Sequence, residues 1–214
     1  GVVQLWDPTT GRELARRPSR PAVTVHDLAF DPSGARLAAA RADATVEITT
    51  VAAGARVGLL HGGHRLGVAT VRFSDDGTLI VTGGRDQRAC VWRAASGALV
   101  ATLVGHASEL TAAEVSPDGL LIATASYDAS VRMWDATDGT LLGVVAHHPL
   151  PVMSLAFSAG GDSLFTAGDD GQVRVWDVGR SVPAGAALAR VVRCRVPFAL
   201  ADTRLVPQPP ACPP

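Results

Sequence analysis

The sequence lacks the features of a membrane-spanning or nucleic-acid-binding chain. No stretch of its 214 residues approaches about 18 consecutive apolar residues, the length that a transmembrane helix requires. The net charge is −1 and no run of like charges occurs, whereas a nucleic-acid surface needs a clustered basic stripe. We therefore expect neither a membrane span nor a nucleic-acid partner. With 47% hydrophobic and 18% charged residues, the chain can bury a substantial core.

Cysteine is scarce, with only Cys90, Cys194 and Cys212 in the chain. These residues show no CxxC or other metal-ligand spacing, and three thiols cannot make a closed disulfide framework. Cys90 stands between Ala89 and Val91 and is expected to be a small buried hydrophobic residue. This cysteine usage is typical of a reducing compartment and predicts a cytoplasmic protein.

Lysine and asparagine are absent, and all 19 basic residues are arginine. We interpret this bias as the codon usage of a GC-rich genome, which predicts a bacterial source. The first residues, GVVQLWD, include neither an initiating Met nor the basic leader of a signal peptide. We expect the chain to be the C-terminal part of a longer protein.

The sequence does contain an internal repeat of 42 to 43 residues. Trp92, Trp134 and Trp176 are 42 residues apart, and Trp6 precedes Trp92 by 86 residues. Thr49 occupies the position between Trp6 and Trp92 where one tryptophan is missing. Four turn sequences recur in the same phase, namely DPSG (31–34), SDDG (74–77), SPDG (116–119) and SAGG (158–161). Repetition at such a period is the signature of a solenoid, a propeller or an array.

Within each period the residues alternate as they do in β-strands. One unit contains four short segments rich in Val, Leu and Thr, namely VATVRFS, TLIVTGG, RACVWR and ALVATL. The connections between them are too short for a helix, so the chain is expected to be all-β. A four-stranded antiparallel sheet of this size cannot bury both faces alone. Like sheets stacked around an axis do bury them, which is the architecture of a β-propeller.

One unit, GHASELTAAEVSPDGLLIATASYDASVRMWD (105–135), resembles a WD repeat along almost its whole length. Residues 63–93 and 147–177 match nearly as well, and the resemblance covers about residues 1–178. It implies a partial, open β-propeller of about four and a half blades, each a four-stranded antiparallel sheet. The expected segments are a partial blade (1–20), a degenerate repeat (21–62), three regular repeats (63–104, 105–146 and 147–178), an extension that forms a hairpin or closing strand (179–207) and a disordered Pro-rich tail (208–214).

Each regular repeat carries a His, a Thr, an Asp and a Trp at matching positions. The resemblance assigns them to a hydrogen-bonded chain that runs from indole through hydroxyl and imidazole to carboxylate. An enzyme needs one activated set in one cleft, whereas a structural network occurs once per blade. Such a network rigidifies a blade when every buried member is satisfied. We therefore expect no catalytic residue and assign as structural tetrads His64, Thr82, Asp86, Trp92, His106, Thr124, Asp128, Trp134, His148, Thr166, Asp170 and Trp176.

The repeat over residues 20–50 departs from this pattern. Pro21, Ala39 and Thr49 stand at the His, Thr and Trp positions, and only Asp43 remains. We expect this blade to lack the polar network. Its stability is predicted to depend on apolar packing by Val25, Leu28, Phe30, Leu37, Val46 and Ile48.

Other polar clusters predict no metal, no cofactor and no small-molecule substrate. In the HGGH segment (61–64), His64 already belongs to a tetrad, and His147–His148 is a variant of the Gly-His pair of the repeat. Asp75–Asp76 and Asp169–Asp170 fall in turns, where Asp caps its own backbone, and a calcium site needs more converging oxygen ligands. The Gly-Gly pairs lack the Lys of a phosphate-binding loop.

Propellers bind with the loops at the ends of their blades, because the strands are committed to packing. In WD repeats, partner contacts come from the residue before the tetrad Asp and from positions just after the His. Arg and Tyr are enriched at interface hot spots, although each such residue is also common in an ordinary solvated turn. The resemblance points on this sequence to His26, Arg85, Glu109, Thr111, Tyr127, Met153 and Asp169.

These observations predict a non-catalytic scaffold or sensor that binds other proteins or peptides on the loop face of a propeller. The alternative is the regulatory C-terminal propeller of a larger signalling enzyme, a kinase or a nucleotide hydrolase, whose catalytic domain lies upstream. We also expect the open propeller to expose unpaired backbone groups at its first and last strands.

Overall fold

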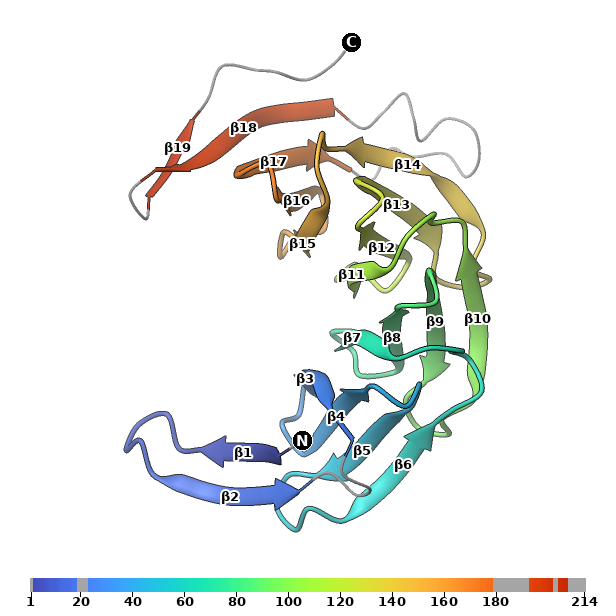
Figure 1. Cartoon of the computed structure of the whole chain (residues 1–214), viewed down its shortest axis with the longest axis vertical. Helices are drawn as coiled ribbons and strands as arrows, with labels where there is room; N and C mark the ends of the chain where they lie inside the picture. The colour runs from blue at the N-terminus through green and yellow to red at the C-terminus, as the bar shows by residue number, and fades with distance from the viewer. Residues whose placement is uncertain (1, 19–22, 179–192, 202–203, 208–214) are drawn as a thin grey trace.

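The structure is a computed structural model that describes residues 2–18, 23–178, 193–201 and 204–207. Every regular element in these ranges is a strand, and every pairing between strands is antiparallel. The strands form five sheets that stand side by side along an open arc (Figure 1). This confirms the expected all-β, open propeller of four-stranded antiparallel blades.

The first sheet is a partial blade of two strands, β1 (Val2–Trp6) and β2 (Glu13–Pro18). In each complete blade the first strand lies on the concave inner side of the arc and the fourth strand on the outer side (Figure 1). The strands of blade 1 are β3 (Val25–Phe30), β4 (Arg36–Arg41), β5 (Val46–Thr50) and β6 (Arg56–Leu60). Those of blade 2 are β7 (Val68–Phe73), β8 (Leu79–Gly84), β9 (Arg88–Arg93) and β10 (Leu99–Val104). Those of blade 3 are β11 (Leu110–Val115), β12 (Leu121–Ser126), β13 (Ser130–Asp135) and β14 (Leu141–His147).

Blade 4 begins with β15 (Val152–Phe157), β16 (Ser163–Gly168) and β17 (Gln172–Asp177). Strand β18 (Arg193–Ala201) pairs with β17 and takes the place of the fourth strand. Strand β19 (Arg204–Pro207) pairs with β18 as a fifth. The predicted extension therefore contributes strands to this sheet, whereas residues 179–192 and the predicted disordered tail (208–214) lie outside the described residues.

The middle strands of a complete blade are buried on both faces, because each blade is packed between two others. Strand β8 reads LIVTGG, and five of its six residues are buried. Such a continuous apolar run is typical of strands covered on both sides. The outer strand β6 (RVGLL) has only its last residue buried. Within the described ranges, no helix has the length and apolar character that crossing a membrane requires.

Three apolar clusters fill the interfaces between consecutive blades from blade 1 to blade 4. In each cluster the tryptophan of one blade packs against the preceding blade. Trp92, Trp134 and Trp176 are accordingly 2%, 2% and 7% exposed. Burying a side chain of this size stabilises the fold by about 3 kcal/mol. Trp6 of the partial blade has no preceding blade among the described residues and is 53% exposed.

Blade 1 corrects the expectation for the degenerate repeat. Leu37, Val46 and Ile48 are buried as expected, but Leu28 is 40% and Phe30 is 54% exposed. Successive side chains of β3 point to opposite faces of the sheet, and the face without Leu28 and Phe30 is the one that packs against blade 2. Leu28 and Phe30 face the opposite way, toward a partial blade that has only β1 and β2 among the described residues.

Blade 1 also contains a polar network that the sequence analysis did not foresee. The side chain of Arg41 is only 3% exposed, and its guanidinium lies 3.0 Å from both the Asp43 and the Glu47 carboxylates. Arg41 stands one repeat before Gly84, where a Cβ atom would lie 2.3 Å from Nδ1 of His64. In blade 2 the tetrad aspartate is paired with a histidine from before the first strand, whereas in blade 1 Asp43 is paired with Arg41, the last residue of the second strand, β4. Blade 1 therefore lacks the tetrad, as expected, but ion pairs of a buried arginine accompany its apolar packing.

The ends of the arc differ in part from the expectation of unpaired strand edges. Strand β1 pairs only with β2 among the described residues, so its other edge is unpaired. However, neighbouring blades pack through the faces of their sheets. Where a blade lacks a full neighbour, the surface left exposed is therefore mainly a sheet face with its side chains, and not the edge of a strand. Leu28 and Phe30 show this at the N-terminal side of blade 1.

Candidate functional site

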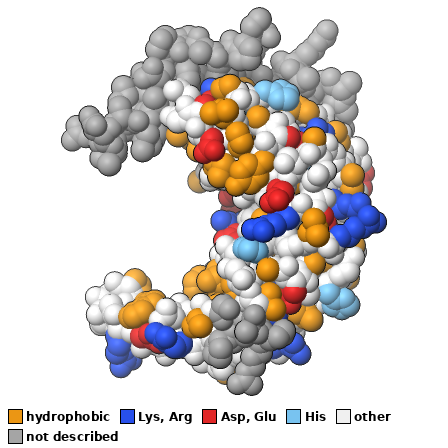
Figure 2. All heavy atoms as spheres, viewed as in Figure 1, with side chains coloured by type: hydrophobic (Ala, Val, Ile, Leu, Met, Phe, Trp, Pro, Cys, Tyr) orange, Lys and Arg blue, Asp and Glu red, His pale blue; other side chains and the backbone are white. Residues whose placement is uncertain are grey.

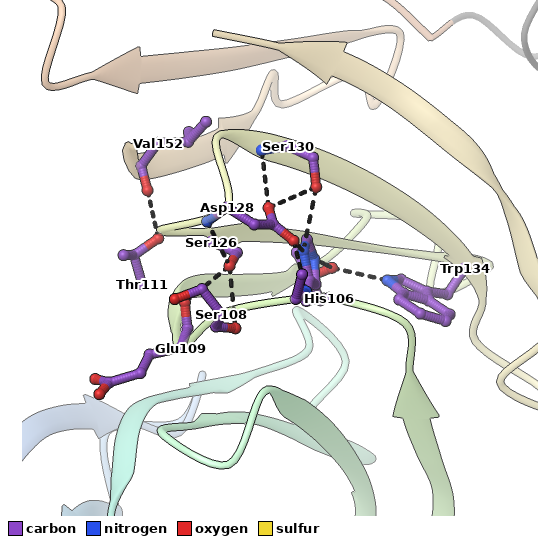
Figure 3. Close-up of polar contacts among 11 residues, drawn as sticks. His106, Ser108, Glu109, Thr111, Ser126, Asp128, Ser130, Trp134 and Val152 are labelled. Carbon is purple, nitrogen blue, oxygen red and sulfur yellow. Dashed lines mark hydrogen bonds and ion pairs between the residues drawn. The ribbon is translucent and has the colours of Figure 1, made fainter. Parts of the chain in front are cut away.

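The tetrad of blade 3 forms one continuous chain of hydrogen bonds (Figure 3). The indole Nε1 of Trp134 donates to Oγ1 of Thr124 at 2.8 Å. His106 lies 2.8 Å from the same hydroxyl through Nε2 and 2.8 Å from the Asp128 carboxylate through Nδ1. The Asp128 carboxylate can only accept, so Nδ1 of His106 carries a proton, and burial lowers the pKa of the imidazole, so that Nε2 stays unprotonated and accepts from the threonine hydroxyl. His106 is then neutral, with its proton on Nδ1 facing Asp128.

Blade 2 repeats this geometry. Trp92 Nε1 lies 3.0 Å from Thr82 Oγ1, and His64 lies 2.7 Å from Thr82 and 3.0 Å from Asp86. Burial lowers the pKa of His64, as it lowers that of His106, which agrees with a neutral imidazole.

In blade 4 the histidine–aspartate end of the tetrad differs from that of blades 2 and 3. Trp176 and His148 lie 2.9 and 2.8 Å from Oγ1 of Thr166, but His148 and Asp170 are 3.5 Å apart. Arg174 forms a 2.7 Å ion pair with Asp170 and contacts Nδ1 of His148. Part of the histidine–aspartate interaction is therefore taken over by the arginine.

The hydroxyl, imidazole and carboxylate groups of a tetrad resemble those of a hydrolase, but their burial prevents such chemistry. Thr82, Thr124 and Thr166 are 0%, 0% and 1% exposed, so no substrate reaches their hydroxyl groups. A nucleophile must lie within contact distance of the substrate. Among the described residues, no group of three or more His, Cys, Asp or Glu side chains is placed to hold a metal ion.

In blades 2 and 3 the tetrad aspartate is hydrogen-bonded to the loop at one end of the blade. In blade 3 the Asp128 carboxylate accepts a hydrogen bond from the backbone N–H of Ala107 at 2.9 Å, and in blade 2 Asp86 accepts one from Arg65 at 2.8 Å. Both donors belong to the loop that enters the first strand of the blade. The buried network thus fixes the backbone of an exposed loop.

We call this end of the blades the loop face. It consists of the turns between the second and third strands (42–45, 85–87, 127–129 and 169–171) and the segments before each first strand (23–24, 65–67, 107–109 and 149–151). One backbone hydrogen bond joins turn to segment in every blade. The four donor–acceptor pairs are Ala42–Thr24, Arg85–Gly67, Tyr127–Glu109 and Asp169–Pro151, at 2.9, 2.9, 3.0 and 2.9 Å.

The first strand of every blade has a β-bulge next to this face. The bulged residue falls between two paired positions and is His26, Ala69, Thr111 or Met153 in blades 1 to 4. A bulge leaves its residue outside the ladder and redirects the side chain. This explains how strand residues come to lie at the inner rim of the loop face.

The structure uses these bulged side chains differently. Met153 is 39% exposed. The hydroxyl of Thr111 donates to the backbone carbonyl of Val152 in blade 4 at 2.6 Å and so links two blades (Figure 3). His26 is partly buried, and its Nε2 has no hydrogen-bond partner among the described residues.

The remaining predicted contact residues are exposed on neighbouring blades. The Arg85 and Glu109 side chains are 50% and 46% exposed, and Arg85 Nε lies 3.7 Å from Glu109 Oε2 across the boundary of blades 2 and 3. Tyr127 is 46% exposed, and Asp169 is also exposed. The Glu109 side chain points away from the polar network around Asp128 (Figure 3).

Two apolar residues of the loop face were missed. Leu66 and Leu150 stand at matching positions, two residues after a tetrad histidine, and are 57% and 48% exposed. An apolar residue in a polar turn segment is the signal that identifies them. On the face seen in Figure 2, hydrophobic side chains gather near the inner ends of blades 3 and 4, next to acidic and basic groups.

Comparison with known proteins agrees with this geometry. The sequence pattern of the family described as "WD domain, G-beta repeat" matches residues 57–93, 97–135 and 139–177, which is more than half of the chain. The chain is also similar to the nuclear distribution protein nudF of Aspergillus niger, with 36% identity over 105 residues. That match covers 49% of this chain and 24% of the length of nudF. The chain therefore belongs to the WD40-repeat family, whose repeats imply a protein-interaction scaffold.

Proposed function

We propose that the chain is a non-catalytic scaffold that binds a partner protein on its loop face, through the surface that carries Arg85, Glu109, Tyr127 and Met153. The observation that supports the proposal is that these four exposed side chains come from three consecutive blades and belong to turns, entry segments or a bulged position at the same end of the blades. The face is also held rigid, because tetrad carboxylates bind the loop backbone beneath it.

The chemistry of this surface fits a binding role. Arginine and tyrosine are the residue types most enriched among interface hot spots. A ring such as that of Tyr127 supplies a large contact area while little side-chain entropy is lost on binding. The tetrad positions are constant among blades 2, 3 and 4, whereas the surface residues differ from blade to blade. If these surface residues served only the packing of the blades, they would not need to differ from blade to blade.

The test is affinity capture of partners with the full-length protein from extracts of its own source cells. Proteins retained by the parent are compared with those retained by Tyr127→Ala and Arg85→Ala. Each change is expected to weaken the interaction by at least about 2 kcal/mol, roughly thirtyfold, with the melting temperature unchanged.

Leu99→Ala is the matched control, because Leu99 is 44% exposed on the outer strand β10 and far from the loop face in the topology of the blade. Deletion of residues 208–214 is the second control. Partners that are lost with either control and retained by both loop-face variants would contradict the proposal.

A further inference from the structure

On the loop face, basic residues lie on blade 2 and acidic residues lie on blades 3 and 4. Blade 2 presents Arg65 and Arg85, the boundary with blade 3 presents Glu109, and blade 4 presents Asp169. Arg65 and Asp169 are both exposed, and neither forms an ion pair with another described residue. The surface therefore has one basic end and one acidic end, and each end has a charge available to a ligand.

Apolar side chains accompany this order of charges. Leu66 follows Arg65 directly, Tyr127 lies on blade 3 between the two ends, and Leu150 and Met153 lie on blade 4. Leu150 belongs to the segment whose Pro151 carbonyl accepts the backbone N–H of Asp169 at 2.9 Å, so it lies close to the acidic end. The apolar residues are 39% to 57% exposed. Apolar contacts rimmed by charges are the usual composition of a protein-binding patch.

From this arrangement we infer that the partner presents a segment with a carboxylate side chain at one end, apolar side chains in the middle and a cationic side chain at the other end. The carboxylate faces Arg65 and Arg85, the apolar residues contact Tyr127 and the exposed leucines, and the cation faces Asp169. The inference rests on the proposed function and adds the chemical class of the partner.

Complementarity of charge excludes the simpler ligands. A uniformly acidic segment would place a carboxylate against Asp169, and a uniformly basic segment would place a cation against Arg65. Like charges brought together at an interface suppress binding of the wrong partner, so such charges act on specificity more than on affinity. Arg85 is shared with Glu109, whose carboxylate lies 3.7 Å away, so Arg65 and Asp169, which form no ion pair with another described residue, are expected to contribute most to the selection of the ligand.

The experiment uses a display library of random peptides, with the full chain as bait. The parent is expected to enrich peptides that carry both an acidic and a basic residue on either side of apolar ones. Asp169→Arg should enrich peptides with acidic residues at both ends instead. A synthetic peptide taken from the parent selection should bind Asp169→Arg and Arg65→Glu roughly fivefold more weakly, as expected for exposed charges.

Asp138→Arg is the matched control, because it makes the same change of charge in the exposed turn between β13 and β14, at the other end of blade 3. It should enrich the same peptides as the parent. Circular dichroism melting curves verify that every bait is folded.

The outcomes separate the two proposals. Peptides that depend on Tyr127 but show no charge pattern, or no response to Asp169→Arg, overturn the inference about the partner and leave the loop face as the binding surface. Peptides that bind Tyr127→Ala as well as they bind the parent contradict the proposed function itself. A selection that enriches no peptide above an empty support overturns the inference.

Discussion

Nη1 of Arg41 lies 3.0 Å from Oε2 of Glu47, inside the blade whose repeat has lost three of its four tetrad residues. The same guanidinium reaches Asp43, the tetrad residue that remains. Loss of the histidine is thus accompanied by an arginine at the position where the next two blades have Gly84 and Ser126. Blade 1 keeps a buried polar network, although its members come from other positions of the repeat.

Replacing this arginine is expected to destabilise the chain strongly. Arg41→Met keeps the volume of the side chain but leaves the Asp43 and Glu47 carboxylates without their cation. Because Asp43 and Glu47 are 34% and 19% exposed, water compensates part of the loss, and a cost of about 1–3 kcal/mol is expected, which is measurable by urea unfolding. Arg16→Met breaks an exposed pair with Glu13 and is the control, expected to leave the unfolding midpoint near that of the parent. Equal effects of the two changes would show that the Arg41 network does not stabilise blade 1.

Asp128 is the tetrad member that we expect to be most costly to remove. Its carboxylate accepts hydrogen bonds from His106 and the Ala107 backbone at 2.8 and 2.9 Å, and from the backbone and hydroxyl of Ser130 at 2.9 and 2.7 Å. Asp128→Ala leaves these donors unpaired and should lower the free energy of unfolding by about 3 kcal/mol. Asp138→Ala, at an exposed turn, should have little effect. A melting temperature of Asp128→Ala within one degree of the parent, roughly 0.3 kcal/mol, would show that the tetrad does not stabilise the blade.

Stability is expected to fall as the pH is lowered from 7 to 5. Burial lowers the pKa of His64, His106 and His148 in the folded chain. In the unfolded chain these imidazoles take up protons at about pH 6.5, so below that pH the unfolded state binds more protons and is favoured. Urea unfolding at constant ionic strength measures this dependence, and His106→Gln should reduce its slope. A free energy of unfolding that is constant or higher at pH 5 would contradict neutral tetrad histidines.

Asp128 adds a second loss of stability at lower pH. Burial alone would raise the pKa of Asp128, but hydrogen bonds from Ser130, Ala107 and His106 outweigh it and lower the pKa. Its contribution to stability is therefore present above about pH 4 and is lost as the pH falls further. In Asp128→Ala this acidic phase of the unfolding profile should be smaller.

The turn after each tetrad aspartate requires a left-handed backbone conformation. Gly171 has a φ of 71°, and the matching residues Ala129 and Gln87 have φ values of 65° and 67°. Gly171→Ala meets no atom within 4 Å of the new Cβ, so its effect reports the backbone alone, and a cost of about 1 kcal/mol is expected. Gly160→Ala, at a glycine without positive φ, is the control and should be neutral or slightly stabilising. A neutral Gly171→Ala would show that the turn relaxes.

Much of the architecture was predictable because it depends on local periodicity. The spacing of Trp92, Trp134 and Trp176 located the third strand of each blade, and the recurring turns located the ends of the strands. The tetrad positions could be assigned from the same phase. Leu28 and Phe30 were misjudged, because their pattern indicates an apolar strand but not which neighbouring sheet covers each face.

What the sequence determined by itself is the repeating unit, that is, four strands, their turns and the polar residues that recur once per blade. These features are local, since strand alternation and turn chemistry involve residues close together in the chain. Only the tertiary structure decided the contacts between blades. The Arg85–Glu109 approach and the Thr111–Val152 hydrogen bond both depend on how adjacent sheets are stacked. The stacking is set by the packing of large side chains between sheets, which a one-dimensional pattern does not encode.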